Sequence, residues 1–391
     1  MTLPEAIISE PRLQRVLAVL SAEGHQALIV GGAVRNGLIG APVEDIDIAT
    51  SARPEQVQAL VEAAGLKQVP TGIEHGTVTV ITDGRAFEVT TFRRDVETFG
   101  RHAVVVFSDR IEEDAARRDF TMNALYATAA GEVIDPMGGL PDLAARRVRF
   151  VGEASARITE DYLRILRFFR FHAWYGAPGA ADEAALAACT RLAKGMASLS
   201  RERIGAEMRK LLAAPDPTEA VSLMQEAGVL EQVLPGADAA TLPALIAAEQ
   251  AIGCAPDPIR RLAILGGNNP AHALRLSRAD ATRLTRLARA HTERFSVDAA
   301  GFHLGCETGR DAALIAQARG AALPEGWPRR LAEAASARLP IAAADIAPPL
   351  VGPAIGRGLR AAERAWIESG FAMPAPGLID VALNADRNSG Q

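Results

Sequence analysis

The sequence has few cysteines, few aromatic residues and no long hydrophobic run. Only three of its 391 residues are cysteine, and Cys189, Cys254 and Cys306 are far apart and odd in number. This usage excludes a disulfide framework and a cysteine-based zinc site. We therefore expect reduced, buried cysteines and a cytoplasmic protein. Charges at Glu5 and Glu10 interrupt the amino terminus, so we expect neither a signal peptide nor a membrane span.

Charge is distributed unevenly along the chain. The net charge is −5, yet residues 143–210 hold 13 Lys and Arg against 7 Asp and Glu. A basic middle in an acidic protein fits a confined phosphate-binding surface, although arginine-rich helices with solvated faces explain it equally well. With 49% hydrophobic and 23% charged residues, the composition is that of a folded globular protein.

Two kinds of hydrophobic pattern divide the chain. Between about residues 25 and 140, short runs rich in β-branched residues alternate with turns, as at 78–81, 86–90 and 103–107. Asp83-Gly84 separates the first two of these runs and predicts a hairpin. From about residue 150 onward helical spacing dominates. We therefore expect an α/β head followed by an all-helical remainder.

A glycine turn and a pair of aspartates mark the first candidate site. Gly31 and Gly32 follow the apolar run 27–30, and Asp45 and Asp47 follow ten and twelve residues after Arg35. The order predicts a strand, a tight turn, a helix and a second strand. In a strand, residues two apart share a face, so the two carboxylates would lie side by side. Such a pair requires a cation, and oxygen ligands favour Mg²⁺.

Further charged residues extend this site. Glu88 lies between apolar neighbours in a predicted strand, either facing solvent or adding a third carboxylate to the pair. Arg117, Arg118 and Asp119 are expected at a helix start, where they would either cap the helix or bind a triphosphate or orient a ribose. Together with the glycine turn, where backbone N–H groups and Arg35 would meet phosphate, these residues indicate nucleotidyl transfer.

Asp161 begins a stripe of charge at three-residue spacing on a predicted helix, whose other members are Arg164, Arg167 and Arg170. An Asp161–Arg164 pair offers an acceptor beside a donor, which complements the Watson–Crick edges of cytosine and adenine but not those of uracil and guanine. The alternative is an exposed ion pair of little energetic value. A following segment, 198–207, is expected to brace the helix that carries Asp161.

In this order and spacing, the motifs resemble the class II tRNA nucleotidyltransferase and poly(A) polymerase family. The likeness covers about residues 27–210. The matching segments are 31–35, 45–47, 88–93, 117–121, 135–139, 160–170 and 201–204. The sequence departs from the family pattern at Asn36, where Asp is usual, and at Tyr162, where Pro is common.

The resemblance implies a polymerase-β-like palm in an α/β head, followed by an all-α neck, body and tail. We expect the head at 1–145, the neck at 146–215 and a tRNA-binding body and tail at 216–391. The family's mobile loop would fall at residues 95–110.

The resemblance also implies roles for the residues above. Asp45 and Asp47 would bind Mg²⁺ and catalyse the reaction with Glu88. Nucleotide binding is implied for eight residues: Gly31, Gly32, Arg35, Arg118, Asp161, Arg164, Arg167 and Arg170.

The implied activity is addition of CMP and AMP from CTP and ATP to the tRNA 3′ end, without a nucleic-acid template and with release of pyrophosphate. An A-adding or CC-adding specialist or a poly(A) polymerase would carry nearly the same catalytic residues. A non-catalytic RNA-binding protein would be expected to lack at least one metal carboxylate, and Asp45, Asp47 and Glu88 are all present.

Overall fold

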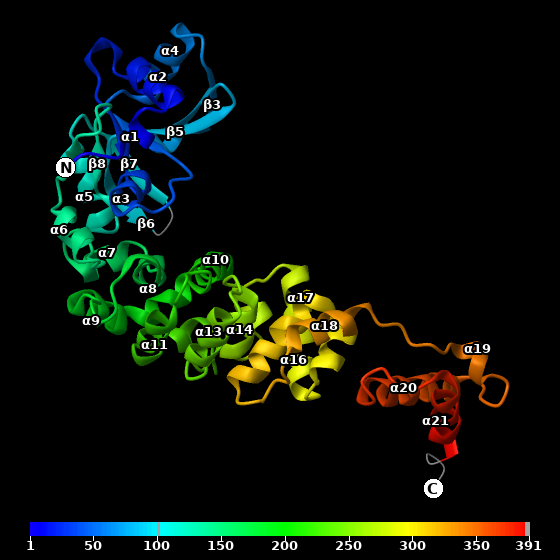
Figure 1. Ribbon diagram of the computed structural model, residues 1–391. Coiled ribbons are helices and arrows are strands. Elements are labelled where there is room, and N and C mark those ends of the chain that lie inside the picture. Colours follow the sequence, from blue (N-terminus) through cyan, green and yellow to red (C-terminus); the bar gives the residue numbers. More distant parts are fainter. Residues whose placement is uncertain (100–101, 388–391) are drawn as a thin grey trace. The chain divides into compact units, whose positions relative to one another are not determined.

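A computed structural model describes residues 1–99 and 102–387, which form two compact units, Met1–Pro235 and Gly236–Gln391. Figure 1 shows the strands confined to the first part of the chain and helices throughout the rest. The α/β head and the helical remainder predicted from the sequence are therefore confirmed. The finer division at residues 145 and 215 stays a prediction.

The first unit is built on a mixed seven-stranded sheet of order β3-β4-β5-β2-β1-β8-β9, with β6 and β7 as a separate hairpin. Strand β2 runs parallel to β5, and the other neighbouring strands are antiparallel. The strands are β1 (Ala27–Val30), β2 (Asp47–Thr50), β3 (Lys67–Gly72), β4 (Thr77–Thr82), β5 (Arg85–Thr91), β6 (Arg93–Phe99), β7 (His102–Phe107), β8 (Tyr126–Ala127) and β9 (Val133–Ile134).

Local sequence explains these strands. Strand β1 is buried throughout, which suits its place between β2 and β8, whereas β4 alternates between buried and partly exposed residues. Asp83 and Gly84 have φ of 46° and 77°, the left-handed pair that a two-residue hairpin turn requires, so the predicted hairpin is confirmed. The predicted loop at 95–110 falls largely on the β6–β7 hairpin, and its residues 100–101 lie outside the described residues.

Helices cover this sheet and continue beyond it. Helices α2 and α4 pack on each other and on strands of the sheet. Each begins with a proline in its first turn, where no backbone N–H is needed. The head helices are α1 (Glu5–Ile8), η1 (Ala22–Gly24), α2 (Pro11–Leu20), α3 (Gly32–Ile39), α4 (Pro54–Ala63), η2 (Ile73–His75), α5 (Ile111–Ala116), η3 (Thr121–Asn123) and α6 (Gly139–Ala144).

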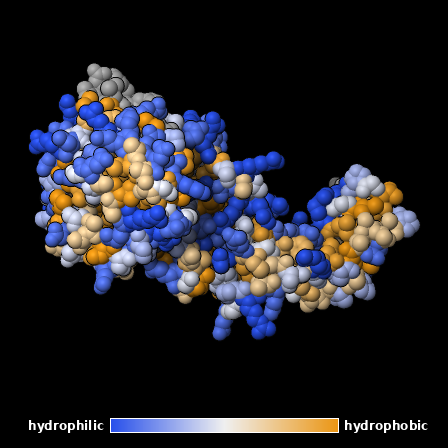
Figure 2. All heavy atoms as spheres, turned by 90° about the horizontal axis from the view of Figure 1, so that it is seen from above, coloured by the Kyte–Doolittle hydropathy of each residue, from blue (hydrophilic) through white to orange (hydrophobic). Residues whose placement is uncertain are grey.

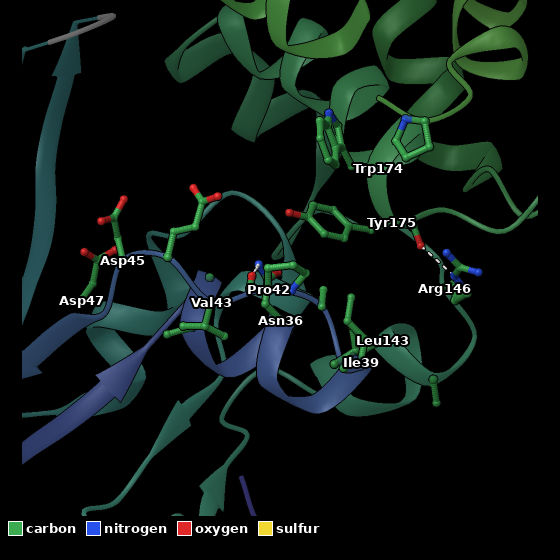
Figure 3. Close-up of a pocket in the computed structure, with 17 residues that line it drawn as sticks. Asn36, Ile39, Pro42, Val43, Asp45, Asp47, Leu143, Arg146, Trp174 and Tyr175 are labelled. Atoms are coloured by element: carbon green, nitrogen blue, oxygen red, sulfur yellow. Dashed lines mark hydrogen bonds between the residues drawn. The ribbon is translucent and has the colours of Figure 1, made fainter. Parts of the chain in front are cut away.

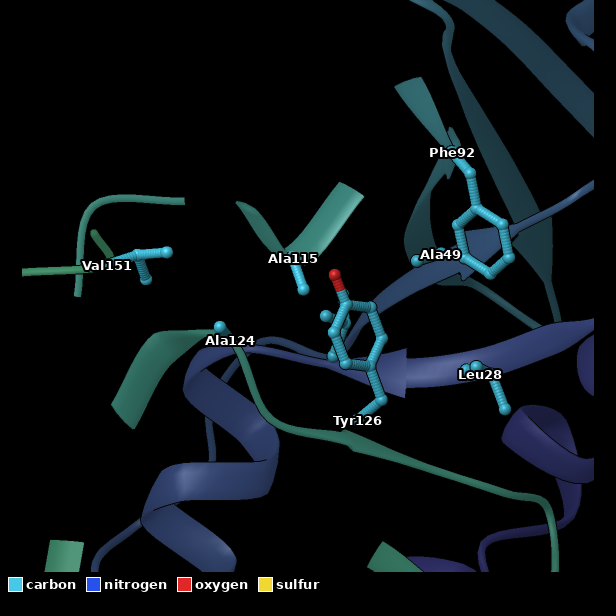
Figure 4. Close-up of a cluster of buried hydrophobic side chains, with 8 residues drawn as sticks. Leu28, Ala49, Phe92, Ala115, Ala124, Tyr126 and Val151 are labelled. Carbon is cyan, nitrogen blue, oxygen red and sulfur yellow. The ribbon is translucent and has the colours of Figure 1, made fainter. Parts of the chain in front are cut away.

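Apolar residues from several elements form the core of the head (Figure 4). Phe92 and Tyr126 are fully buried and meet edge to face, with ring centroids 6.5 Å apart. The other buried members of this cluster are Leu28, Val30, Ala49, Ala115, Ala124 and Val151. The core thus joins the central strands to the segment around residues 115–126, which also carries site residues.

Aromatic packing ties the following helices to the head within the first unit. Phe120 contacts both Phe150 and Phe171, with ring centroids 4.9 and 5.0 Å away. Phe171 belongs to the helix that carries the predicted arginine stripe. The remaining helices of this unit are α7 (Ala154–Glu160), α8 (Leu163–Tyr175), α9 (Glu183–Leu192), η4 (Ala193–Ser198), α10 (Arg201–Leu212), α11 (Thr218–Glu226) and α12 (Val229–Val233).

The second unit consists of helices. Its helices are α13 (Leu242–Ala251), α14 (Pro258–Leu265), α15 (Pro270–Ala273), α16 (Arg278–Thr292), α17 (Val297–Ala318), α18 (Trp327–Ser336), α19 (Ala343–Ile346), α20 (Pro353–Glu368) and α21 (Ala375–Arg387). No helix within the described residues is long and apolar enough to span a bilayer. Figure 2 shows hydrophilic residues over much of the visible surface, interspersed with hydrophobic areas.

Three local expectations need correction. Cys189 is buried as predicted, but Cys254 is only partly buried and Cys306 is exposed; all three are free thiols. Arg117 is the carboxy-terminal cap of α5, so Arg117-Arg118-Asp119 follows a helix instead of starting one. Asp161 caps the end of α7 with extended backbone angles and therefore does not share a helix with Arg164.

Candidate functional site

The glycine turn connects β1 to α3 as the sequence predicted. Gly31 has φ of 68° and precedes the first residue of α3, a conformation that other residues rarely adopt. A Cβ at Gly31 would lie 3.4 Å from Nη1 of Arg118. Arg118 therefore lies against the glycine turn at the amino terminus of α3, where backbone N–H groups favour anions.

The acidic residues gather where β2 begins. Strand β2 starts at Asp47, so Asp45 lies just before the strand and not within it, a correction to the sequence prediction. Figure 3 shows the Asp45 and Asp47 side chains next to each other. Asp47 and Glu88 are partners in the parallel β2–β5 register, so the strand that carries Glu88 lies beside the one that begins at Asp47. All three residues are exposed.

Electrostatics at Asp47 fit a cation. Although Asp47 is exposed as a residue, the protein around its carboxylate removes part of its hydration and raises its pKa. The negative charges of Glu88 and Asp45 raise the pKa further, and Arg118 opposes them. A divalent cation would relieve this repulsion, so the donor set fits a hard metal ion. Within the described residues, no three His, Cys, Asp or Glu side chains are arranged together as metal ligands. Glu88 is therefore not grouped with the aspartates in a ready-made set.

Arg35 is buried, with 6% of its surface exposed, where the sequence predicted a phosphate contact. Its guanidinium donates to Asn36, Asn123 and the Tyr175 hydroxyl and lies over the Tyr175 ring, 4.0 Å from the centroid. The Asn36 amide also donates to the Pro42 carbonyl at 2.8 Å, a bond that an ionised Asp could not donate. Asn36 thus ties the glycine-turn helix to the loop that leads to Asp45.

Arg118 is held beside the glycine turn by a buried carboxylate. Its Nη2 donates to Asp114 at 2.9 Å and its Nε donates to the Tyr126 hydroxyl at 3.0 Å. Asp114 is only 1% exposed, and although its burial opposes ionisation, Arg117 and Arg118 hold its pKa down to about 2. Asp114 was not among the residues predicted from the sequence, although it lies three and four residues before two arginines.

Asp161 is fixed by α10. Its Oδ2 accepts from Nη2 of Arg203 at 2.6 Å, and its Oδ1 accepts from the backbone N–H of Leu163. The expected bracing by segment 198–207 is therefore confirmed. Arg164 instead donates to Glu160 and to the Arg157 carbonyl, so the direct Asp161–Arg164 pair is not formed in this structure.

The other two arginines of the stripe also have carboxylate partners. Arg167 donates from Nε to Asp119 at 2.8 Å, and this contact holds the pKa of the deeply placed Asp119 carboxylate at about 2 despite its burial. Arg170 donates to Glu207 of α10 at 2.6 Å. The stripe therefore connects α8 to the head through Asp119 and to α10 through Glu207.

A cavity of about 960 Å³ opens beside the acidic residues. Figure 3 shows Asp45 and Asp47 on one side of it and Trp174, Tyr175 and Arg146 on the other. The rest of its lining comes from Gly32, Ala33, Asn36, Ile39, Gly40, Ala41, Pro42, Val43, Glu44, Leu143, Ala144 and Pro215. Trp174 and Tyr175 were not predicted as site residues, although two adjacent aromatic residues are unusual in a chain with only three Trp and three Tyr.

Comparison with known proteins identifies the domains around this site. Residues 27–149 match the model of the poly A polymerase head domain. Residues 181–241 match a model described as the probable RNA and SrmB-binding site of polymerase A. The chain thus contains a poly A polymerase head domain, followed by a segment that matches the polymerase A RNA-binding model. The resemblance inferred from the sequence is thereby confirmed.

Individual relatives of this family match over part of their length. The chain is 44% identical over 233 residues to the CCA-adding enzyme of Geobacillus thermodenitrificans (strain NG80-2), which covers 58% of this chain and 56% of that enzyme. It is 38% identical over 258 residues to the Homo sapiens CCA tRNA nucleotidyltransferase 1, mitochondrial, which covers 65% of this chain and 59% of the relative. The chain thus spans a little over half the length of these curated relatives.

Solved structures of the family match over nearly the whole chain. The Bacillus stearothermophilus CCA-adding enzyme in complex with CTP has a TM-score of 0.68 and 29% identity, covering 97% of this chain and 98% of that one. The Thermotoga maritima CCA-adding enzyme complexed with tRNA has a TM-score of 0.68 at 17% identity, a likeness of fold alone. The fold of this chain is therefore that of the CCA-adding enzymes.

Proposed function

We propose that this chain adds CMP and AMP from CTP and ATP to the 3′ end of tRNA, as a CCA-adding nucleotidyltransferase. The observation that carries the proposal is the pair Asp45 and Asp47, which lie side by side, with Glu88 opposite Asp47 in the β2–β5 register of a poly A polymerase head domain. The relative solved with CTP supports the choice of substrate because it matches 97% of this chain at 29% identity.

In this proposal Asp45 and Asp47 hold Mg²⁺, with Glu88 as the neighbouring catalytic carboxylate. The bound metal would promote ionisation of the attacking 3′-hydroxyl and neutralise charge on the leaving pyrophosphate. Gly31 and Gly32 leave room at the start of α3 for the phosphates of the nucleotide, and Arg118 faces them from its anchored position. Catalysis then consists mainly of aligning the 3′-hydroxyl with the α-phosphate.

The residues around α8 would read the base. Asp161, oriented by Arg203, offers carboxylate oxygens to the amino group of cytosine or adenine. Arg164, Arg167 and Arg170 would line the same pocket and supply donors, and Arg35 would hold α3 and Tyr175 in place from its buried position. Base selection by side chains in this way needs no nucleic-acid template.

We include Mg²⁺ as the metal and a cytoplasmic location in the proposal. Carboxylate ligands favour Mg²⁺ over softer metals. The three free cysteines fit a reducing compartment.

Narrower activities of the same family are the nearest alternatives. An A-adding enzyme would use ATP alone on a tRNA ending in CC, a CC-adding enzyme would stop after two cytidines, and a poly(A) polymerase would add more than one adenosine. A non-catalytic RNA-binding protein would incorporate nothing. The length and composition of the product distinguish these activities.

Replacing either aspartate tests the proposed metal site. Asp45→Ala and Asp47→Ala should each reduce CMP and AMP incorporation by at least about a thousandfold, because a two-carboxylate clamp that loses one ligand no longer positions the metal. Binding of tRNA, measured by gel shift, should change little. Glu62→Ala, an exposed carboxylate of the same domain, is the matched control. Full activity in either aspartate variant would contradict the assignment.

A further inference from the structure

The cavity beside Asp45 and Asp47 differs in composition from the proposed nucleotide pocket. Of the eight residues assigned to nucleotide binding, Gly32 alone contributes to its described lining; Arg118, Asp161 and the stripe arginines do not. The two aspartates do line it. Nucleotidyl transfer brings the nucleotide and the acceptor strand together at the metal carboxylates. A cavity that adjoins these carboxylates but lacks the residues assigned to nucleotide binding therefore suits the acceptor strand.

Trp174 gives this cavity a fixed aromatic surface. It is the penultimate residue of α8, and its indole Nε1 donates to the Lys210 carbonyl of α10 at 2.8 Å. The hydrogen bond holds one edge of the ring, while 39% of the residue remains exposed; few large hydrophobic residues in the described part of the chain are so open. A ring that is held at its edge and open beside a cavity is suited to stacking against a nucleic-acid base.

Charge in the cavity favours one strand orientation. Asp45, Asp47 and Glu44 make one side of the cavity acidic. On the other side Arg146 is an exposed cation, and its Nε donates to the Tyr175 carbonyl at 3.3 Å. No carboxylate of the described residues lies within ion-pair distance of Arg146. A phosphate is attracted to the Arg146 side, and the uncharged 3′-hydroxyl terminus is the part of a strand that best tolerates the acidic side.

We propose that this cavity holds the 3′-terminal nucleotides of the RNA acceptor, with a base stacked on Trp174 and a backbone phosphate at Arg146. The strand then runs with its 3′-hydroxyl toward Asp45 and Asp47. Trp174 and Arg146 are positioning residues, since they hold the acceptor without contacting the reacting atoms. The inference rests on the proposed function for the identity of the acceptor.

Intrinsic fluorescence tests the stacking directly and without catalysis. A tRNA ending in CC, added in the absence of nucleoside triphosphates, should quench wild-type tryptophan emission more than that of Trp174→Phe, and the difference reports Trp174 alone. CTP or ATP without RNA should produce no such difference. A difference produced by the free nucleotides, or none with the RNA, would overturn the assignment.

Steady-state kinetics provide the second test. Trp174→Ala should raise the KM for the tRNA about tenfold, since stacking on an aromatic residue is worth roughly this much in affinity, and it should leave the KM for CTP and ATP unchanged. Trp174→Phe, which keeps an aromatic face, should restore most of the affinity. Arg146→Gln should weaken tRNA binding and reduce its salt dependence, unlike Arg15→Gln on the exposed face of α2.

The outcomes separate this inference from the proposed function. A rise in the KM for nucleotide with an unchanged KM for tRNA would overturn the acceptor assignment. A wild-type chain that shows Trp174 quenching by tRNA but incorporates no nucleotide would contradict the proposed function and still support the cavity as the RNA site.

Discussion

At the scale of single residues, buried partners decide what each charged side chain can do. The sequence identified Arg35 and Arg118 from their place in motifs, but it could not show that Arg35 is enclosed by Tyr175 and Asn123. Asn123 lies 88 positions from Arg35 in the sequence and Tyr175 lies 140 positions from it, so no local sequence pattern encodes these contacts. The pair Asp45 and Asp47 was predictable because its spacing alone brings the carboxylates together.

Asp114 carries a prediction about stability and pH. Its pKa in the folded protein is about 2, below the unfolded value of 3.8, so it contributes stability that is present above pH 3.8 and lost as the pH falls through 2. This shift is worth about 2 kcal/mol at neutral pH. In urea denaturation at pH 7, the free energy of unfolding of Asp114→Asn should be lower than that of the wild type by at least this amount. The difference between the two free energies of unfolding should decrease below pH 4.

The control for this experiment is Asp109→Asn, an exposed carboxylate nearby in the sequence. It should unfold like the wild type across the same pH range. A stability difference for Asp114→Asn that stays constant from pH 7 to pH 2 would contradict the role given to its ionisation.

At the scale of elements, helix ends were harder to predict than helix positions. Three-residue spacing predicted one helix through Asp161 and Arg164, yet the Asp161 side chain accepts from the Leu163 N–H and ends the helical run, as Asp commonly does. At α5, three acidic residues lie in the first turn, and Arg117 and Arg118 follow at the carboxyl end. This order is favourable because the helix dipole attracts acidic residues to the amino end of a helix and basic residues to its carboxyl end. That order was available in the sequence.

The α10 brace predicts an effect on base selection. Arg203→Gln removes the charged partner that orients Asp161, so the preference for CTP over UTP, measured as the ratio of kcat/KM values, should fall about tenfold. Lys194→Gln, an exposed cation in the same region, should leave the ratio unchanged. An Arg203→Gln enzyme that loses rate with both nucleotides equally would contradict a role in selection.

At the scale of the whole molecule, the fold class followed from the sequence, whereas the ionic interior of the second unit did not. Arg260 is 1% exposed and bonds Glu249 at 2.7 Å and Asp311 at 2.9 Å, and Arg261 also bonds Glu249. These residues come from three helices. A prediction from amphipathic spacing assigns charged residues to the solvent-facing side of a helix. Sequence alone could not place them in a core.

This buried network predicts a large stability effect in the second unit. Arg260→Ala removes one cationic partner each from Glu249 and Asp311, which should lower the free energy of unfolding by about 3–5 kcal/mol. Hydrogen exchange measured by mass spectrometry should show faster exchange in peptides from residues 236–387. Arg289→Ala removes an exposed pair with Glu293 and should change exchange little. Equal effects of both substitutions would contradict the structural role of the network.

The most direct test of the account is the sequence of nucleotides that the chain adds to a tRNA lacking its CCA end. With Mg²⁺, CTP and ATP, the account predicts two cytidines followed by one adenosine, no adenosine with ATP alone, and termination after the third nucleotide. Absence of incorporation, or addition without regard to base, would contradict the claim that Asp45, Asp47 and the residues around Asp161 form a CCA-adding site.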